Sequence, residues 1–226
     1  MRLAEVPEEL KAGVISHLHT VFSIRHAVTP IEYIPPKPAW VTVPVNNQDV
    51  AEAQNRYKAL ELSGASLERN YSKYRWVGQL GEIALDRWLC STSVPFVWNN
   101  KHGDHGGSDF IILDTTVDVK ASDRSRYPDN HWTVGMSDFQ KTRGKYDDYF
   151  FCLYMKPPAD PEVILIGGLD RIRFNDTAVL SKKNEQLHKD MRVSKTMWNV
   201  TITDPTKPHQ WLQKITGKPC TILNLI

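Results

Sequence analysis

Two carboxylates and an amine lie close together in one short stretch of this chain, and their types and spacing suit phosphodiester chemistry. Residues 110–113 form an apolar run, residues 114–116 are typical of a turn, and residues 117–121 have the composition of a second strand. Asp109 stands at the root of the first strand. Because strand side chains alternate between faces, Asp118 and Lys120 are predicted to share one face of the second. Neighbouring carboxylates repel each other, and a hard divalent cation bound by oxygen ligands relieves that repulsion.

Each of these residues also has an ordinary structural interpretation. The pattern Asp/Glu-x-Lys is weak, and it recurs at Glu9 and Lys11, where the charges suit an exposed helix start. Asp118 and Lys120 fit a solvated strand face as well, and Asp109 fits a turn after the glycines that precede it. The order of the surrounding elements is more specific than any one of these residues, and it favours the chemical interpretation.

A third carboxylate, Glu82, comes from a predicted helix over residues 77–85. One apolar face of this helix is marked by Trp76, Leu80, Ile83, Ala84 and Trp88. Glu82 lies on the same side of the helix as Leu85 and Leu89. A carboxylate bordered by leucines needs a partner or a metal ion. Gly78 and Gly81 weaken a helix, which predicts close backbone packing at both positions.

Together, the acidic helix, a strand, the Asp109 strand and the Asp118-Val119-Lys120 strand resemble the PD-(D/E)XK nuclease superfamily. This superfamily includes many restriction enzymes, recombination exonucleases and junction resolvases. Gly107-Ser108-Asp109 stands where the family has Pro-Asp, so the proline is missing. The resemblance covers about residues 76 to 175. It implies an α/β fold with a restriction-endonuclease-like core, in which helices flank a mixed central β-sheet.

The resemblance also implies a mechanism and a set of site residues. Glu82, Asp109, Asp118 and Lys120 form the expected catalytic set. The three carboxylates and the carbonyl of Val119 are expected to bind Mg²⁺, for which Mn²⁺ substitutes. Lys120 is expected to position or deprotonate the attacking water and to offset charge on the phosphorus. The products would carry 5′-phosphate and 3′-hydroxyl ends.

Basic residues follow the predicted site and are candidates for binding a phosphate backbone. They are Arg124, Arg126, Lys141, Arg143 and Lys145. Acidic residues are interleaved with them and the net charge is only +2, so a solvated mixed surface is the alternative interpretation. Histidines at positions 102 and 105 precede Asp109 in a glycine-rich loop, where solvent exposure is the more ordinary role.

The function favoured by the sequence is that of a Mg²⁺-dependent nuclease, foremost a DNA endonuclease. The alternatives are an exonuclease or a junction resolvase of the same fold, or a nucleic-acid-binding protein that no longer cleaves. The chain contains no phosphate-binding loop of the Gly-x-x-x-x-Gly-Lys type, no Gly-x-Ser-x-Gly elbow and no His-Glu-x-x-His motif, which argues against a nucleotide-driven motor, a serine hydrolase and a zinc protease.

The expected organisation is a single nuclease domain over residues 1–226. Residues 1–70 would be a helical and proline-rich extension, and residues 71–226 the core. In the extension we expect helices at 7–23, at 47–62 and from 66 onward, with an extended or irregular segment at 29–45. In the second half we expect a helix capped by Ser137, strands at 149–155 and 163–168, a helix at 176–189 capped by Asn175 or Asp176, an edge strand at 198–203 and a helix at 209–215.

Composition is that of a folded protein, with 41% hydrophobic and 24% charged residues. No apolar run has the length of a membrane span, and the first residues lack the apolar core of a signal peptide. The three cysteines lie in apolar contexts and are predicted to be reduced. We therefore expect a cytoplasmic protein that binds nucleic acid and not membranes, and a homodimer is left open as its assembly.

Overall fold

The computed structural model describes residues 39–62, 76–99, 107–156, 161–188, 191–192 and 196–219. These residues all belong to one compact unit, Ala39–Ile226. Several predictions lie outside the described residues: the helix at 7–23, the segment at 29–38, the first residues of the helix from 66, the histidines at 102 and 105, and Cys220. The single-domain organisation of the whole chain stays a prediction.

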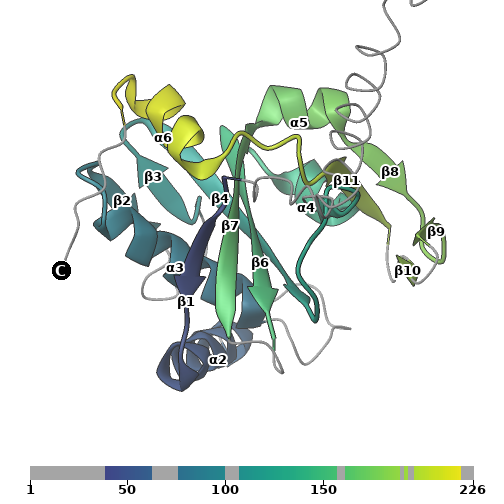
Figure 1. Cartoon of the computed structure of the whole chain (residues 1–226), viewed down its shortest axis with the longest axis horizontal. Helices are drawn as coiled ribbons and strands as arrows, with labels where there is room; N and C mark the ends of the chain where they lie inside the picture. Colours follow the sequence, from purple (N-terminus) through teal and green to yellow (C-terminus); the bar gives the residue numbers. More distant parts are fainter. Residues whose placement is uncertain are drawn as a thin grey trace, which may run out of the picture. The chain divides into compact units, whose positions relative to one another are not determined.

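A six-stranded mixed sheet forms the centre of the described unit (Figure 1). Its strands, in spatial order, are β1 (Val41–Pro44), β7 (Glu162–Asp170), β6 (Asp148–Met155), β4 (Thr115–Arg124), β3 (Phe110–Ile112) and β2 (Phe96–Trp98). Strands β4 and β6 are parallel, and every other neighbouring pair is antiparallel. Helices flank this sheet, so the predicted mixed α/β architecture is confirmed.

Strand β6 is the most deeply buried element, and all eight of its residues are buried. This is the strand predicted from the near-continuous apolar run at 149–155. Its one carboxylate, that of Asp148, accepts a hydrogen bond of 2.6 Å from the indole Nε1 of Trp211. That bond satisfies an acid that the strand would otherwise bury without a partner.

The hairpin between β3 and β4 turns more tightly than predicted. Thr115 and Thr116 belong to β4, and the connection consists of Leu113 and Asp114. Leu113 has a φ of 53°, the left-handed conformation that two-residue hairpin loops require. Leucine rarely adopts that conformation, so the residue type does not indicate it, and the cross-strand pairing imposes it.

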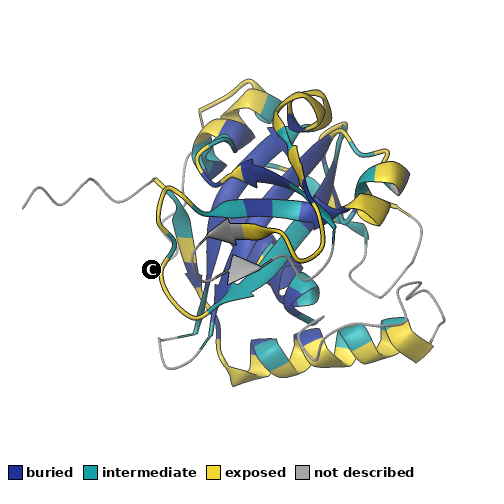
Figure 2. Ribbon diagram, turned by 90° about the vertical axis from the view of Figure 1, so that its right-hand side faces the viewer, coloured by how far each residue is buried: buried dark blue, intermediate teal, exposed yellow. Residues whose placement is uncertain are grey.

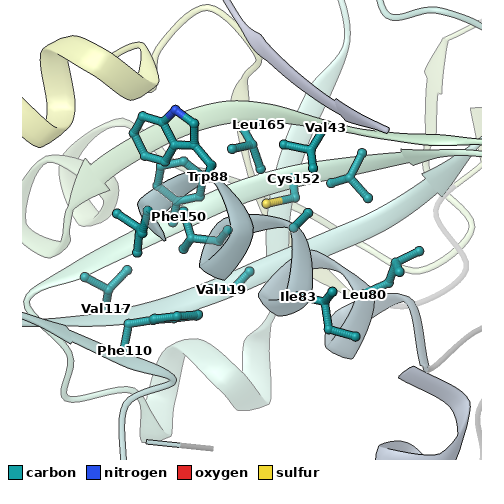
Figure 3. Close-up of a cluster of buried hydrophobic side chains, with 14 of the residues drawn as sticks. Val43, Leu80, Ile83, Trp88, Phe110, Val117, Val119, Phe150, Cys152 and Leu165 are labelled. Atoms are coloured by element: carbon teal, nitrogen blue, oxygen red, sulfur yellow. The ribbon is translucent and has the colours of Figure 1, made fainter. Parts of the chain in front are cut away.

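Helix α3 (Trp76–Cys90) packs on one face of the sheet, where it buries the first of two hydrophobic clusters. In Figure 3, Trp88 of this helix lies beside Phe150 of β6, and Val119 and Cys152 belong to the same cluster. Helix α6 (Pro208–Thr216) covers the same cluster further along, with the ring centroid of its buried tryptophan 4.6 Å from that of Phe150. The predicted helix at 209–215 is thereby confirmed.

The two glycines of α3 differ in what surrounds them. A Cβ built on Gly81 would lie 2.7 Å from the Cβ of Ala121, so the absence of a side chain lets the helix approach β4 closely. A Cβ on Gly78 would meet no atom of the described residues within 4 Å. The prediction of close packing is therefore confirmed for Gly81 and wrong for Gly78, which lies on a part of the helix that β4 does not approach.

A three-stranded antiparallel sheet covers the other face of the central sheet. Its strands are β5 (Thr133–Ser137), β11 (Met197–Thr201) and β8 (Val179–Ser181), with β11 in the middle. Figure 1 shows β8 and β11 beside the short helices α4 (Asp138–Arg143) and α5 (Arg171–Thr177). A second hydrophobic cluster joins this sheet to β6, β7 and α5. The remaining strands, β9 (Gln186–His188) and β10 (Met191–Arg192), pair with each other.

Two predictions for this half of the chain are wrong. The helix expected at 176–189 does not form, because α5 begins at Arg171, capped by Asp170, and ends at Thr177. The chain then pairs with β11 as β8, where Ser181 accepts a side-chain hydrogen bond of 3.1 Å from Asn199. For the same reason β11 is a central strand and not the edge strand expected at 198–203. The Ser137 cap of α4 is confirmed, with a complete capping box.

Helix α2 (Asn47–Leu62) has the bounds predicted for it. Figure 2 shows most of its length exposed, and only Asp49 and Ala53 are buried. Asp49 accepts a bond of 2.6 Å from Arg87 of α3, which ties the two helices together. In the part of the chain that the structure describes, no helix is long and apolar enough to cross a membrane.

Candidate active site

The predicted site lies where β3 leaves β4. Strand β3 pairs with β4 only from Phe110 to Ile112, whereas β4 continues alongside β6 as far as Arg124. Asp109 stands at the point of divergence, and its carboxylate Oδ2 accepts a hydrogen bond of 2.6 Å from the backbone N–H of Val119. This bond holds the acid against the segment of β4 that carries the other two predicted residues.

Asp118 and Lys120 share one face of β4, as strand alternation predicts. Val119 points to the opposite face, where it is buried beneath α3. The Lys120 Nζ lies 2.5 Å from Asp118 Oδ2, and each of the two side chains is only 12% exposed. A bare solvated strand face is therefore the wrong interpretation of this pair, because both groups are mostly removed from water.

Glu82 is the most enclosed of the three carboxylates, with 4% of its surface exposed. Its Oε1 accepts a hydrogen bond of 2.8 Å from the side-chain amide of Gln79, and its Oε2 accepts one of 3.1 Å from the indole Nε1 of Trp98 in β2. The partner that an acid among leucines requires therefore exists within the chain. Trp98 was not predicted as a site residue. The sequence offered one indication of it, because tryptophan has an N–H donor and this one follows the acidic helix.

The three carboxylates act on one another electrostatically. Burial raises the pKa of Glu82 to about 7; the Trp98 hydrogen bond and the charge of Arg56 oppose this, and Asp118 adds to it. Burial also raises the pKa of Asp109 well above its ordinary value, and the negative charges of Glu82 and Asp118 raise it further. The fold thus brings Glu82, Asp109 and Asp118 near enough for their charges to repel, as expected of a clustered acidic site.

Lys120 is held in its charged form. Burial by itself lowers its pKa, but the charges of Asp118 and Asp109 outweigh burial, so the net direction is upward. A lysine with a raised pKa is a poor proton acceptor at neutral pH. Of the two roles expected for Lys120, this arrangement favours offsetting negative charge over deprotonating water.

A second group that was not predicted is Tyr146, which precedes β6. Its hydroxyl donates a hydrogen bond of 3.3 Å to the backbone carbonyl of Gly107, just before Asp109. Burial raises the pKa of this hydroxyl, and the charges of Asp118 and Asp109 raise it further. Tyr146 therefore stands beside the carboxylates at the start of the Asp109 segment. Its position depends on the parallel pairing of β6 with β4, and no local spacing pattern indicates it.

The donor set suits a hard divalent cation, although the carboxylates are not arranged around one point. Among the described residues, no group of three or more His, Cys, Asp or Glu side chains is positioned to hold a metal ion. Asp118 is paired with Lys120, and Glu82 is held by its two hydrogen bonds. Binding would therefore require the Asp118 carboxylate to exchange the ammonium of Lys120 for the cation. Burial is the largest cause of the raised pKa values of Glu82 and Asp109, and neighbouring carboxylates add to it, so a bound cation would stabilise their ionised forms.

The predicted nucleic-acid-binding residues occupy different surroundings. The guanidinium carbons of Arg124 and Arg126 lie 5.4 Å and 5.7 Å from the ring centroid of Trp132. Lys141 lies over the ring of Trp198, with its Nζ 3.2 Å from the centroid. Arg126 and Lys145 are exposed, whereas Arg124 and Lys141 are partly buried. The side chain of Arg143 lies outside the described residues.

No protein-family model matches this chain, and a search of curated proteins found no match either.

Proposed function

We propose that this protein is a divalent-metal-dependent nuclease that hydrolyses phosphodiester bonds, with DNA as its substrate and internal cleavage as its mode of action. The observation that carries the proposal is that Lys120 pairs with Asp118 and the N–H of Val119 between them binds Asp109, while the charges of these residues influence the pKa of Glu82 or of one another. Glu82 is far from the other three in the sequence. Two of the acids, Glu82 and Asp118, are buried, and burying an acid is unfavourable unless it has a partner.

The order of the elements supports the same proposal. An acidic helix, a strand, a strand that begins next to Asp109 and a strand with Asp118 and Lys120 follow one another as α3, β2, β3 and β4. This is the order that the resemblance to PD-(D/E)XK nucleases leads us to expect, within a restriction-endonuclease-like core. The absence of a side chain at Gly81 lets α3, which carries Glu82, pack closely against β4.

In the proposed mechanism, Glu82, Asp109, Asp118 and the carbonyl of Val119 would hold Mg²⁺ or Mn²⁺. A cation held there would supply a water of lowered pKa and would offset charge on the phosphoryl oxygens. Lys120, once released from Asp118, donates hydrogen bonds to the phosphoryl oxygens and stabilises the charge that develops on them. Asp109 remains bonded to the N–H of Val119 in β4, which keeps it close to Asp118 on the same strand.

The proposal is tested by incubating the full chain with closed circular duplex, linear duplex, single-stranded DNA and RNA, each with Mg²⁺, with Mn²⁺ and with EDTA. We expect cleavage of closed circular DNA with either metal and none in EDTA. Lys120→Ala should abolish cleavage but retain most nucleic-acid binding, because affinity comes from many backbone contacts. Lys218→Ala, which changes an exposed lysine after α6, is the matched control and should still cleave.

Each alternative outcome has a definite meaning. Cleavage of linear but not circular DNA would identify an exonuclease, which needs an end. Full cleavage by Lys120→Ala would reduce the Asp118-Val119-Lys120 pattern to coincidence, and full activity in EDTA would refute the metal mechanism.

One observation favours a second candidate, a nucleic-acid-binding protein that does not cleave. Each of the three carboxylates already has a partner within the chain, namely Lys120, the N–H of Val119, and the pair formed by Gln79 and Trp98. If the wild-type protein binds DNA and cleaves none of the substrates with any metal, this second candidate is the correct one.

A further inference from the structure

Arg56 of α2 and Trp98 of β2 form a contact that leads directly to Glu82. The guanidinium carbon of Arg56 lies 4.1 Å from the centroid of the Trp98 ring, within the range of a cation–π interaction. The side chain of Arg56 is only 13% exposed, and its Nε is 3.0 Å from Glu52 on the same helix. Its Nη1 is buried and has no hydrogen-bond partner among the described residues.

Among the described residues, Phe110 and Arg56 both contact the ring of Trp98 and help to set its plane. The ring of Phe110, the first residue of β3, is stacked with that of Trp98 at a centroid distance of 5.5 Å and an interplanar angle of 15°. Arg56 contacts the same ring through its guanidinium group. Since the indole N–H lies in the ring plane, fixing that plane fixes the direction in which Trp98 donates its hydrogen bond.

That hydrogen bond ends on the carboxylate of Glu82. Trp98 Nε1 donates to Oε2 at 3.1 Å, while Gln79, one turn earlier on α3, donates to Oε1 at 2.8 Å. With one donor on each oxygen, the carboxylate cannot rotate without breaking a bond. The orientation of Glu82 therefore depends on a chain of contacts that begins on α2.

We propose that Arg56 and Trp98 are positioning residues that hold the Glu82 carboxylate in one orientation at the proposed cation site. This inference rests on the proposed function, in which Glu82 is a ligand of that cation. Residues that hydrogen-bond to metal ligands orient them, and replacing such residues costs about 10- to 100-fold in metal affinity or activity. Helix α2 is then a part of the site and not a passive addition to the fold.

Two variants remove single steps from this chain of contacts. Trp98→Phe keeps an aromatic ring for Arg56 and Phe110 but lacks the N–H that reaches Glu82. Arg56→Met keeps an unbranched side chain over the ring but lacks the charge. We expect Trp98→Phe to weaken Mn²⁺ binding about tenfold and Arg56→Met to weaken it by a smaller factor, as measured by calorimetry or by electron paramagnetic resonance of free Mn²⁺.

Arg56→Met separates a positioning role from a simple charge effect by the direction in which Mn²⁺ affinity changes. Removing a positive charge near a cation site tightens cation binding if charge alone matters, because like charges repel. Weaker Mn²⁺ binding by Arg56→Met is therefore the result expected of a positioning role, and tighter or unchanged binding would overturn it. Arg56→Lys, which keeps a cation over the ring, should restore most of the affinity.

Arg87→Met is the matched control for loss of stability. Arg87 also joins α2 to α3, through a bond of 2.6 Å to Asp49, and it donates a bond of 2.9 Å to the carbonyl of Pro44. Neither bond involves Trp98 or Glu82. The variant should lower the thermal midpoint in EDTA while leaving the Mn²⁺ dissociation constant unchanged. Equal Mn²⁺ affinity in Trp98→Phe and wild type would overturn the inference alone. A wild-type protein that binds no Mn²⁺ would overturn the inference together with the metal mechanism.

Arg56→Met also tests whether the buried Nη1 serves the substrate directly. Binding of a short duplex in EDTA, with no cation present, should be the same for Arg56→Met and wild type. A several-fold loss of duplex affinity in EDTA, with Mn²⁺ affinity unchanged, would show that Arg56 contacts a phosphate and would refute the positioning role.

Discussion

Replacing Glu82 with glutamine should change how the stability of the metal-free protein depends on pH. Glutamine has nearly the shape of glutamate and can keep both hydrogen bonds, because its carbonyl accepts from Trp98 and its amide donates to Gln79 once the Gln79 amide is turned over. What it removes is the ionisation of a carboxyl whose pKa burial raises to about 7.

The sign of the effect follows from the direction of that pKa. Glu82 has an ordinary pKa of 4.5, which we take for the unfolded chain, and a pKa of about 7 when folded. The folded protein therefore holds the proton more tightly. The resulting stabilisation is fully present below pH 4.5 and is lost as the pH rises through 7. Between pH 5 and pH 8 the loss amounts to about 2 to 3 kcal/mol of unfolding free energy.

Denaturant unfolding in EDTA at several pH values between 5 and 8 would measure this loss of unfolding free energy. Wild type should lose stability across that range, and Glu82→Gln should lose less, by about 2 to 3 kcal/mol. Asp109 contributes in the same direction, so the variant keeps part of the dependence. Glu61→Gln, at an exposed position of α2, is the control and should behave as wild type. If Glu82→Gln shows the full wild-type dependence, the carboxyl is not buried in the way described.

Gly78→Ala should stabilise the protein by up to about 1 kcal/mol, because alanine favours the helix and no described residue lies within 4 Å of the new Cβ, whereas Gly81→Ala should destabilise it by forcing α3 away from β4. Thermal melts would show the opposite signs. Asp118→Asn should lower metal-free stability by about 1 to 3 kcal/mol, since Lys120 loses a charged partner, and thermal melts should show Mn²⁺ stabilising the variant less than wild type. Replacing both Arg126 and Lys145 with alanine should reduce the log–log salt slope of duplex binding by roughly one to two, and an unchanged slope would return them to ordinary surface.

Local sequence features determined many of the elements correctly. The Ser137 cap of α4 and the buried strand β6 follow from capping chemistry and a continuous apolar run, and the predicted bounds of α2 are those of the structure. The shared face of Asp118 and Lys120 follows from the alternation of strand side chains. These features are governed by neighbouring residues, so the sequence by itself contains the information.

Helix and strand assignment failed where a distant strand overrides local preference. Residues 179–181 pair with β11 and not with their own neighbours in a helix, and the Asp170 cap places α5 earlier than expected. The left-handed Leu113 is likewise imposed by the pairing of β3 with β4.

Some residues of the candidate site were predicted from the sequence, and others were identified only in the folded structure. Sequence indicated Glu82 as an acid that needed a partner, but which groups surround it depends on how α2, α3 and β2 pack together. Only the tertiary structure could supply Trp98 as its hydrogen-bond donor, Arg56 as the cation over that indole and Tyr146 beside the other carboxylates. The physical reason is that a buried charge is stabilised by whatever the fold brings within a few ångströms, and separation along the chain does not determine that distance.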